Sequence, residues 1–328
     1  MQTDTFIEVK NLSRYYGSLC AVNNIEFEVK RGEVLGFLGP NGAGKSTTMK
    51  MITGNLAPSS GQVAVNGIDL FDKPKQAKAH IGYLPEQPPL YSQLTVDEYL
   101  VYCAQINRVA RNEISQAVTR VKQRCGLTET GNRLIANLSK GFQQRVGLAQ
   151  AIIHSPDIVI LDEPTVGLDP IQIREIRELI RELGKEHCII ISTHILPEVQ
   201  ALCDTVQIIN KGQIVLKDSV ESLARYMQTT SLTLAMKRPP ALDSLSQISD
   251  IIEVEQLKDE RFCLHYLPEK NPAEEIVKLS VKNDWGLVEL SPHRRSLEDI
   301  FVDITTSENN HPDDENKHDS DNPDEKAQ

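Results

Sequence analysis

The sequence predicts an α/β fold with a mostly parallel sheet, followed by a small second domain. From residue 6 to about residue 220, short apolar runs alternate with segments of helical periodicity, as expected of buried parallel strands joined by helices. Between about 87 and 150 the strand pattern stops and helical periodicity continues alone, which indicates a helical insertion. Strand-like alternation returns beyond residue 229 and indicates the second domain.

Four strands of the first domain, residues 6–228, follow from their apolar pattern. Residues 25–29 alternate between apolar and polar side chains, which is typical of a strand with one buried face. Three runs are apolar throughout, as in strands that are covered on both faces: 34–38, 158–161 and 188–191. The helical segment lies between the first and second of these runs, so we predict that it is inserted into the α/β domain.

The second domain, residues 229–306, is predicted to be a small α+β unit. Leu232, Leu234 and Met236 alternate with polar or small residues, and a similar alternation at 262–266 predicts another strand. Helices are predicted at 273–282 and from Ser296 onward, where apolar residues share one face.

The last segment, residues 307–328, is predicted to be disordered. It holds eight acidic residues, two lysines and few apolar residues, so it cannot bury enough surface to offset the entropy lost on folding. The segment carries over half of the chain's net charge of −11.

Composition argues against several classes of protein. Apolar residues make up 40% and charged residues 25% of the chain, which are ordinary globular values. No apolar run reaches the length of about 18 residues that a transmembrane helix needs, and the N-terminus lacks the pattern of a signal peptide. We therefore expect a cytoplasmic protein that reaches a membrane only through a partner.

The acidic balance argues against nucleic-acid binding. The six cysteines are scattered along the chain, which predicts reduced thiols without disulfides or a metal site.

A phosphate-binding loop is predicted between the strand at 34–38 and a following helix. Residues 39–46 read G-x-x-x-x-G-K-S, in which glycines let backbone N–H groups face a phosphate chain at a helix N-terminus. Lys45 would reach the β- and γ-phosphates of ATP, and the Ser46 hydroxyl would ligate Mg²⁺. The residues predicted to bind ATP here are Gly39, Pro40, Asn41, Gly42, Ala43, Gly44, Lys45, Ser46 and Thr47.

A magnesium and water site is predicted at Asp162 and Glu163, which directly follow the apolar run at 158–161. Acidic residues at the carboxyl end of a buried strand lie where α/β sheets bind their ligands. Asp162 would hold Mg²⁺ through its water shell, and Glu163 would orient and polarise the attacking water. The two motifs together predict binding and hydrolysis of Mg-ATP.

A third motif extends the pattern to a known family. Residues 138–145, Leu-Ser-Lys-Gly-Phe-Gln-Gln-Arg, precede the strand at 158–161 and resemble the signature sequence of ABC ATPases. With the two motifs above, in this order, the resemblance covers residues 6 to about 220. It implies a P-loop NTPase fold of the ABC type with a helical subdomain.

The resemblance implies roles for further residues. Tyr16 occupies the place where the family stacks an aromatic ring on adenine, Glu86 lies at the Q-loop, Asp169 lies in the D-loop, and His194 resembles the switch histidine. Taken alone, Tyr16 is compatible with a surface aromatic residue and His194 with a structural histidine. Ser139 and Gly141 of the signature would contact the γ-phosphate bound by a partner subunit, so a second copy or a paralogous subunit is implied.

Two positions depart from the commonest family pattern. Lys140 and Phe142 replace Gly and Gln in the signature, while Ser139 and Gly141 are retained. Glu86 replaces Gln; a carboxylate can still ligate Mg²⁺ but brings negative charge near the γ-phosphate. The adjacent Gln87 is the alternative residue for this role.

The C-terminal unit and the Tyr83-Leu84-Pro85-Glu86 segment resemble those of bacterial ATPases that power multidrug, polysaccharide or gliding-motility exporters. The implied protein is the ATP-binding subunit of an ABC exporter, which dimerises on the cytoplasmic face of separate membrane-embedded permease subunits. The alternative is a soluble ABC ATPase that acts on ribosomes or DNA. The single ATPase unit and the short helical insertion favour the transporter, and Glu163 with His194 argue against a regulatory module without turnover.

Deleting residues 307–328 is expected to leave ATP hydrolysis and the midpoint of thermal unfolding nearly unchanged, because the segment is too polar to join a core. Turnover and melting of the truncated chain test this directly. A truncated chain that loses most of its turnover or melts markedly earlier would show that the segment is structural.

Overall fold

The computed structural model describes residues 5–222, 231–257, 261–266, 270 and 272–293. The chain forms two compact units that divide between Gln228 and Thr229. The helix predicted from Ser296 onward and the acidic segment 307–328 lie outside the described residues.

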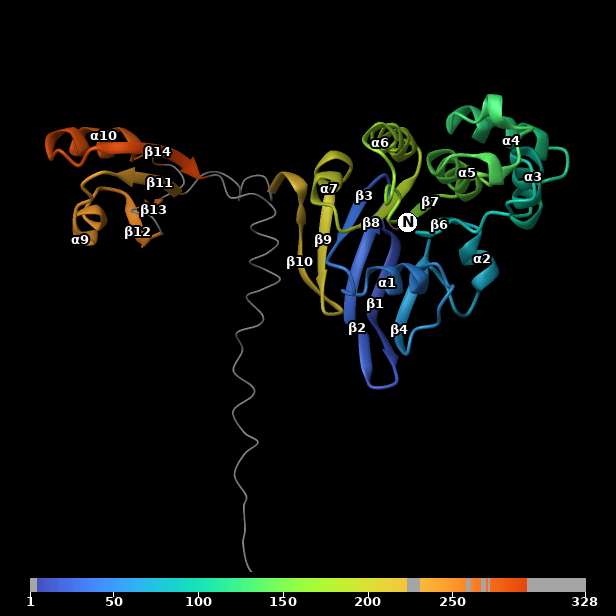
Figure 1. Cartoon of the computed structure of the whole chain (residues 1–328). Coiled ribbons are helices and arrows are strands. Elements are labelled where there is room, and N and C mark those ends of the chain that lie inside the picture. The colour runs from blue at the N-terminus through green and yellow to red at the C-terminus, as the bar shows by residue number, and fades with distance from the viewer. Residues whose placement is uncertain (1–4, 223–230, 258–260, 267–269, 271, 294–328) are drawn as a thin grey trace, which may run out of the picture. The chain divides into compact units, whose positions relative to one another are not determined.

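The first unit is built on a mostly parallel sheet (Figure 1). Its six described strands lie in the order β10-β9-β3-β8-β7-β6, and only β10 runs antiparallel to its neighbour. In chain order these strands are β3 (Val34–Leu38), β6 (Ile81–Leu84), β7 (Ile158–Asp162), β8 (Cys188–Thr193), β9 (Thr205–Asn210) and β10 (Gln213–Ser219). The apolar runs at 34–38, 158–161 and 188–191 are fully buried central strands, which confirms their prediction.

An antiparallel sheet packs against the helix that follows β3. Its described strands lie in the order β2-β1-β4-β5: β1 (Thr5–Tyr16), β2 (Leu19–Lys30), β4 (Ser60–Val65) and β5 (Ile68–Asp69). Met49 and Ile52 of α1 (Lys45–Ile52) share one buried core with Phe27 of β2 and Phe37 of β3. This helix is therefore held between two sheets, which fixes the direction of its N-terminus. The short helix α2 (Pro74–Lys78) follows β5.

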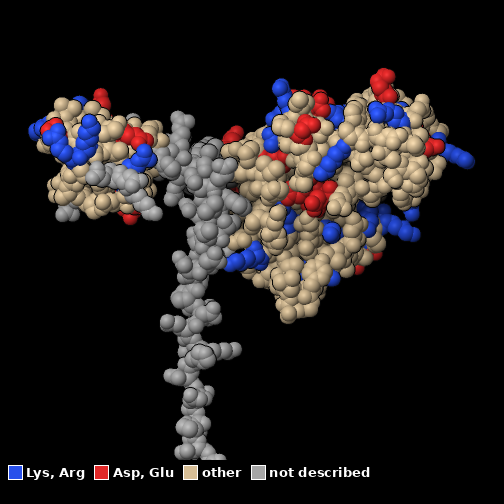
Figure 2. Space-filling model, in the orientation of Figure 1, with Lys and Arg blue, Asp and Glu red and all other residues tan. Residues whose placement is uncertain are grey.

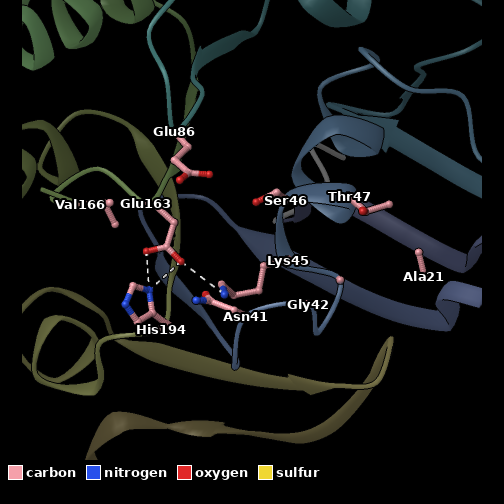
Figure 3. A pocket seen from close by; sticks show the side chains of 11 residues that line it. Ala21, Asn41, Gly42, Lys45, Ser46, Thr47, Glu86, Glu163, Val166 and His194 are labelled. Carbon is pink, nitrogen blue, oxygen red and sulfur yellow. Dashed lines mark hydrogen bonds and ion pairs between the residues drawn. The ribbon is translucent and has the colours of Figure 1, made fainter.

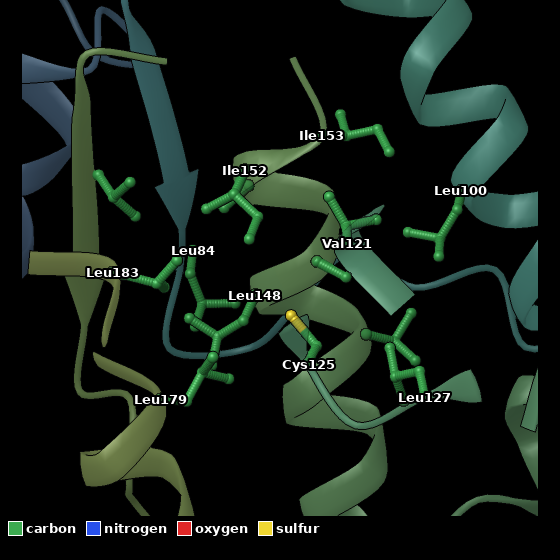
Figure 4. Packing of buried hydrophobic residues seen from close by; sticks show 14 of the residues in the cluster. Leu84, Leu100, Val121, Cys125, Leu127, Leu148, Ile152, Ile153, Leu179 and Leu183 are labelled. Atoms are coloured by element: carbon green, nitrogen blue, oxygen red, sulfur yellow. The ribbon is translucent and has the colours of Figure 1, made fainter. Parts of the chain in front are cut away.

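The predicted insertion is helical. It contains α3 (Val96–Ile106), α4 (Ile114–Arg124), α5 (Lys140–Ile152) and the short 3₁₀ helices η1 (Thr128–Thr130) and η2 (Ile135–Asn137). Leu148 of α5 lies among Leu84 at the end of β6, Val121 of α4 and Leu179 of α6 (Pro170–Gly184) in one core (Figure 4). The insertion and the sheet therefore share a continuous apolar interior.

Side-chain caps set where three of these helices begin. Thr95 and Glu98 form a reciprocal capping box at α3, and Asp169 with Gln172 does the same at α6. At α5, the Ser139 hydroxyl accepts a hydrogen bond from the Phe142 N–H. Two of these caps, Ser139 and Asp169, are residues for which the sequence implied a nucleotide-related role.

The second unit is a four-stranded antiparallel sheet with two described helices. The strand order is β12-β13-β11-β14, and Leu232, Leu264, Ile276 and Trp285 contribute to its core. Its elements are β11 (Ser231–Met236), α9 (Leu242–Ser246), β12 (Ile251–Gln256), β13 (Arg261–Tyr266), α10 (Ala273–Lys282) and β14 (Leu287–His293). The strands predicted around Leu232 and at 262–266 and the helix at 273–282 are confirmed, whereas α9, β12 and β14 had not been predicted.

Within the described ranges, no helix combines the length and the apolar character needed to cross a membrane.

Candidate functional site

The register of the parallel sheet brings three sequence motifs to one edge. Leu38, the last residue of β3, pairs with Thr193 of β8, and Asp162 of β7 pairs with Ser192 of β8. The residues that come next therefore leave the sheet side by side: the loop from Gly39, Glu163, and His194. Ligands of open α/β sheets bind outside the carboxyl ends of the strands.

A cavity of about 390 Å³ opens at this edge. It is lined by Ala21, Asn41, Gly42, Gly44, Lys45, Ser46, Thr47, Glu86, Glu163, Val166 and His194. Figure 3 shows the loop and the start of α1 on one side, with Glu163 and His194 facing Lys45 and Glu86 descending from another segment. The structure thus places most residues of the predicted loop, Glu163, Glu86 and His194 around one space. Gly39, Pro40 and Ala43 belong to the loop but do not line this space.

Glycine conformations shape the loop. Gly42 and Gly44 have φ angles of 82° and 108°, in the region that residues with a Cβ atom disfavour. A Cβ at Gly44 would also lie 2.6 Å from the Ala21 carbonyl oxygen. The Gly44 carbonyl accepts the Thr48 N–H, so α1 starts immediately after this glycine. The helix N-terminus consequently faces the cavity, as anion binding requires.

Glu163 lies between a cation and an imidazole. Its carboxylate is 3.3 Å from Lys45 Nζ and 2.9 Å from His194 Nδ1, and its side chain is only 7% exposed. Because a carboxylate only accepts hydrogen bonds, the Nδ1–H of His194 is the donor. The Glu163 backbone has a φ of 48°, a left-handed conformation that is costly for this residue type. The structure holds it there through the hydrogen bond from Glu163 N–H to the Ser192 carbonyl.

Lys45 is turned back over its own loop. Nζ donates to the carbonyl oxygens of Gly39, at 2.9 Å, and Pro40, at 3.3 Å. With Glu163 as a third acceptor, the buried ammonium has its hydrogen bonds satisfied. This arrangement places a positive charge at the loop, where phosphate oxygens could take over as acceptors.

Asp162 does not line the cavity, but it contacts Ser46, which does, and it is nearly inaccessible to solvent. Burial raises the pKa of its carboxyl, hydrogen bonds from Ser192 and Ser46 oppose that shift, and the charges of Glu163 and Glu86 add to it. Oδ1 accepts from Ser192 Oγ at 2.7 Å and from Ser46 Oγ at 3.2 Å. A nearby divalent cation would favour the ionised form that burial disfavours.

The donor set fits a cation that is bound together with a nucleotide. Among the described residues, no three histidine, cysteine or acidic side chains converge to hold a metal by themselves. Mg²⁺ typically takes one or two protein oxygens and completes its shell with water and substrate phosphates. Ser46 Oγ, Asp162 and Glu86 supply oxygens beside the phosphate loop in that manner.

The remaining predicted residues do not line the cavity. Tyr16, at the end of β1, is 45% exposed. The Arg14 guanidinium lies over its ring, with Cζ 4.8 Å from the ring centroid. Ser139 and Gly141 lie at the start of α5. Asp169 caps α6, where its Oδ1 accepts the N–H groups of Ile171 and Gln172. In one copy of the chain, Ser139, Gly141 and Asp169 therefore lie at the starts of two helices outside the cavity, and Tyr16 lies at the end of β1.

Glu86 and Gln87 differ in the cavities that they line. Glu86 lines both the first cavity and a neighbouring one of about 440 Å³, which Lys140 and Gln144 also line. Gln87 lines only the second cavity. Of the two alternatives at this position, Glu86 is thus the residue that faces the phosphate loop.

Sequence reasoning missed Ser192, which holds Asp162 in place, and the cavity-lining residues Ala21 and Val166. Ser192 stands two residues before His194 at the end of an apolar run, so its position was a usable signal.

Charges of both signs are interspersed over the visible face of the first unit (Figure 2). Acidic side chains gather near the middle of this face, and lysine and arginine side chains surround them. The expectation that the chain does not bind nucleic acid stays a prediction.

The chain is similar to several known proteins in sequence and in fold. Residues 22–166 match a family model described as ABC transporter. The bacitracin transport ATP-binding protein BcrA of Bacillus licheniformis is 35% identical over 303 residues, covering 92% of this chain and 97% of that protein. The linearmycin resistance ATP-binding protein LnrL of Bacillus subtilis (strain 168) is 30% identical over 307 residues, covering 91% and 98%. A solved ATP-binding subunit of an ABC transporter has a TM-score of 0.61 and 34% identity, covering 67% of this chain and 92% of that chain.

Replacing Ser192 with alanine is expected to raise the Mg²⁺ concentration needed for half-maximal ATP hydrolysis by about 10-fold, because Asp162 loses its shortest hydrogen bond. A Mg²⁺ titration of turnover at fixed ATP measures the change. The control is Ser13→Ala, which removes a buried hydroxyl that accepts the Asn24 N–H and lines no part of the cavity. Equal Mg²⁺ requirements in Ser192→Ala and wild type would contradict this role.

Proposed function

Because this chain belongs to the ABC transporter family of ATP-binding proteins, whose members hydrolyse ATP, we propose that it powers export through permease subunits on separate chains. It is an ATPase, and the contact of Glu163 with both Lys45 and His194 beside the phosphate loop is the observation that carries the detailed proposal. The name of one relative, the linearmycin resistance protein, favours export over import.

The phosphate loop and Lys45 bind the β- and γ-phosphates of ATP in this proposal. Backbone N–H groups at the start of α1 face the anion, and Lys45 exchanges its carbonyl and Glu163 contacts for phosphate oxygens. Ser46, Asp162 and Glu86 would hold Mg²⁺, which would neutralise charge on the phosphates. Tyr16 supplies an exposed aromatic ring for the adenine.

Glu163 and His194 act on the chemical step. Once phosphate oxygens have replaced Glu163 as the acceptor of the Lys45 ammonium, the Glu163 carboxylate is free to orient the attacking water and accept its proton. His194 keeps its Nδ1–H on Glu163, and its side chain, 41% exposed, lines the cavity. In its doubly protonated form the imidazole could also donate from Nε2 toward the γ-phosphate. The reaction transfers the γ-phosphoryl group to water, and positioning and charge neutralisation supply most of the catalysis.

A second copy, or a paralogous subunit, completes the site. Ser139 and Gly141 begin α5, so they offer a hydroxyl, N–H groups and the helix dipole to an anion, yet neither lines the cavity of its own chain. Asp169 likewise begins α6 outside this cavity. We infer that Ser139 and Gly141 meet the γ-phosphate bound by the partner subunit and that the two nucleotides lie within the dimer interface.

The composite site predicts a trapped dimer. Glu163→Gln should retain ATP binding and slow hydrolysis, so with Mg-ATP the variant is expected to accumulate as a dimer in size-exclusion chromatography with light scattering. Adding Ser139→Ala should abolish that dimer, because the γ-phosphate loses its contact across the interface.

Lys45→Ala should weaken both ATP binding and hydrolysis.

The control separates the signature contact from simple loss of a helix cap. Thr95→Ala removes the N-cap of α3, as Ser139→Ala does for α5, but lies outside the proposed interface. It should leave the Glu163→Gln dimer intact. A Glu163→Gln chain that stays monomeric at saturating ATP, alone and when mixed with a paralogous subunit, would refute the composite site.

The permease is proposed to dock where the helical insertion meets the core, on the cytoplasmic face of the membrane. A cavity of about 570 Å³ lies there, lined in part by Lys50, Lys78, Tyr83, Pro85 and His154. No acidic side chain is among its described lining residues. Within the described structure, Tyr83 Oη and His154 Nδ1 are buried without a hydrogen-bond partner. The cavity thus offers both charge and unused polar atoms to a partner.

This groove is connected to the nucleotide site through Glu86. Pro85 lines the groove and the next residue, Glu86, lines the nucleotide cavity. ATP-driven movement of Glu86 would therefore displace the groove wall, which gives the docking loop its coupling role.

Glu86→Gln is expected to change coupling to the permease more than nucleotide affinity, because an amide oxygen can still reach Mg²⁺. ATP affinity and permease-stimulated turnover are measured in the same variant. Glu129→Gln, the same change at an exposed position of η1, serves as the control. A large loss of affinity with coupling unchanged would contradict the proposed docking role.

A further inference from the structure

A buried carboxylate on α7 (Leu196–Leu202) contacts two segments that carry the proposed catalytic residues. Glu198 is 1% exposed, and its two oxygens accept hydrogen bonds from different threonines. Thr193 Oγ1 donates to Oε2 at 2.8 Å, and Thr165 Oγ1 donates to Oε1. Thr193 directly precedes His194, and Thr165 stands two residues after Glu163.

The same network fixes the backbone beside both residues. Thr193 Oγ1 accepts the N–H of Ile195, so one hydroxyl contacts the residue after His194 as well as Glu198. On the other side, the Val166 N–H donates to the Glu163 carbonyl and the Leu168 N–H to the Thr165 carbonyl. Glu198 therefore connects the two loops that carry Glu163 and His194.

A third contact extends the network to α6. Arg177 Nη2 lies 3.6 Å from Glu198 Oε1 and supplies the opposite charge that a buried carboxylate requires. Arg177 belongs to the helix that Asp169 caps. A displacement of α6 at the dimer interface would thus reach Glu198 through an ion pair and the threonines through hydrogen bonds.

We propose that Glu198 is a positioning residue for ATP hydrolysis: it holds the Glu163 carboxylate and the His194 imidazole in contact and links their placement to α6. The inference rests on the proposed roles of Glu163 and His194. Glu198 lines no part of the nucleotide cavity, so it touches neither ATP nor water in the reaction. Its effect is on geometry, and small misplacements of catalytic groups reduce rates strongly.

The test compares turnover with binding in purified full-length protein. Glu198→Gln keeps the shape of the side chain but removes its charge and one of its acceptor oxygens. We expect kcat at saturating Mg-ATP to fall by about 10-fold or more, while ATP affinity changes by less than about 3-fold. Thr193→Val should behave in the same way, and Thr193→Ser, which keeps the hydroxyl, should restore most of the rate.

Glu33→Gln is the matched control. Glu33 also accepts a threonine hydroxyl, that of Thr205, together with the Lys30 N–H, but it stands at the opposite end of the sheet, just before β3. Its substitution should leave kcat unchanged. If Glu198→Gln does not fold, the comparison of Thr193→Val with Thr193→Ser decides the question.

Two outcomes overturn the inference. One is a wild-type kcat in both Glu198→Gln and Thr193→Val; the other is a parallel loss of kcat, ATP affinity and thermal stability, which would make Glu198 a general structural residue. Glu163→Gln, assayed alongside, shows whether the proposed function fails or only the positioning role of Glu198. If Glu163→Gln turns over at the wild-type rate, the proposed function fails; if it is inactive while Glu198→Gln is not impaired, only the positioning role fails.

Discussion

The candidate site depends on one short-range arrangement, the Glu163 carboxylate held between the Lys45 ammonium and the His194 imidazole. These residues follow three neighbouring strands, β7, β3 and β8, so the register of the parallel sheet determines their spacing. A shift of one residue in any pairing would turn the strand over and separate them. The apolar runs that stabilise the sheet therefore also determine the geometry of the chemistry.

The buried charges at this edge are stable only because they are paired. Lys45 and Glu163 are each less than one-tenth exposed, and an isolated charge at such a depth would be costly. In the proposed function, phosphate oxygens would take the place of Glu163 on Lys45 and release the carboxylate when water must be activated. Binding of the nucleotide and readiness for hydrolysis would then be linked by one exchange of partners.

Local patterns predicted much of this architecture. The run at 34–38 followed by the glycine-rich loop predicted the strand, the loop and the start of α1, and the run at 158–161 predicted the buried strand that ends at Asp162. Contacts between residues distant in sequence were not predictable in this way. Ser192 reaches Asp162 across a strand pairing, and Glu198 meets Thr165 only after α7 folds back against the sheet. In the second unit, β12 and β14 were missed because only the central strands β11 and β13 bury enough of their side chains to show a clear alternation.

The most direct measurement is the rate of the chemical step in a single turnover, with the protein in excess over labelled ATP and Mg²⁺ present. If Glu163 is the base that activates water, Glu163→Gln should bind the nucleotide as wild type does and cleave it at least about 100-fold more slowly. Cleavage by Glu163→Gln at the wild-type rate would contradict the account, because the contact between Lys45, Glu163 and His194 would then have no part in hydrolysis.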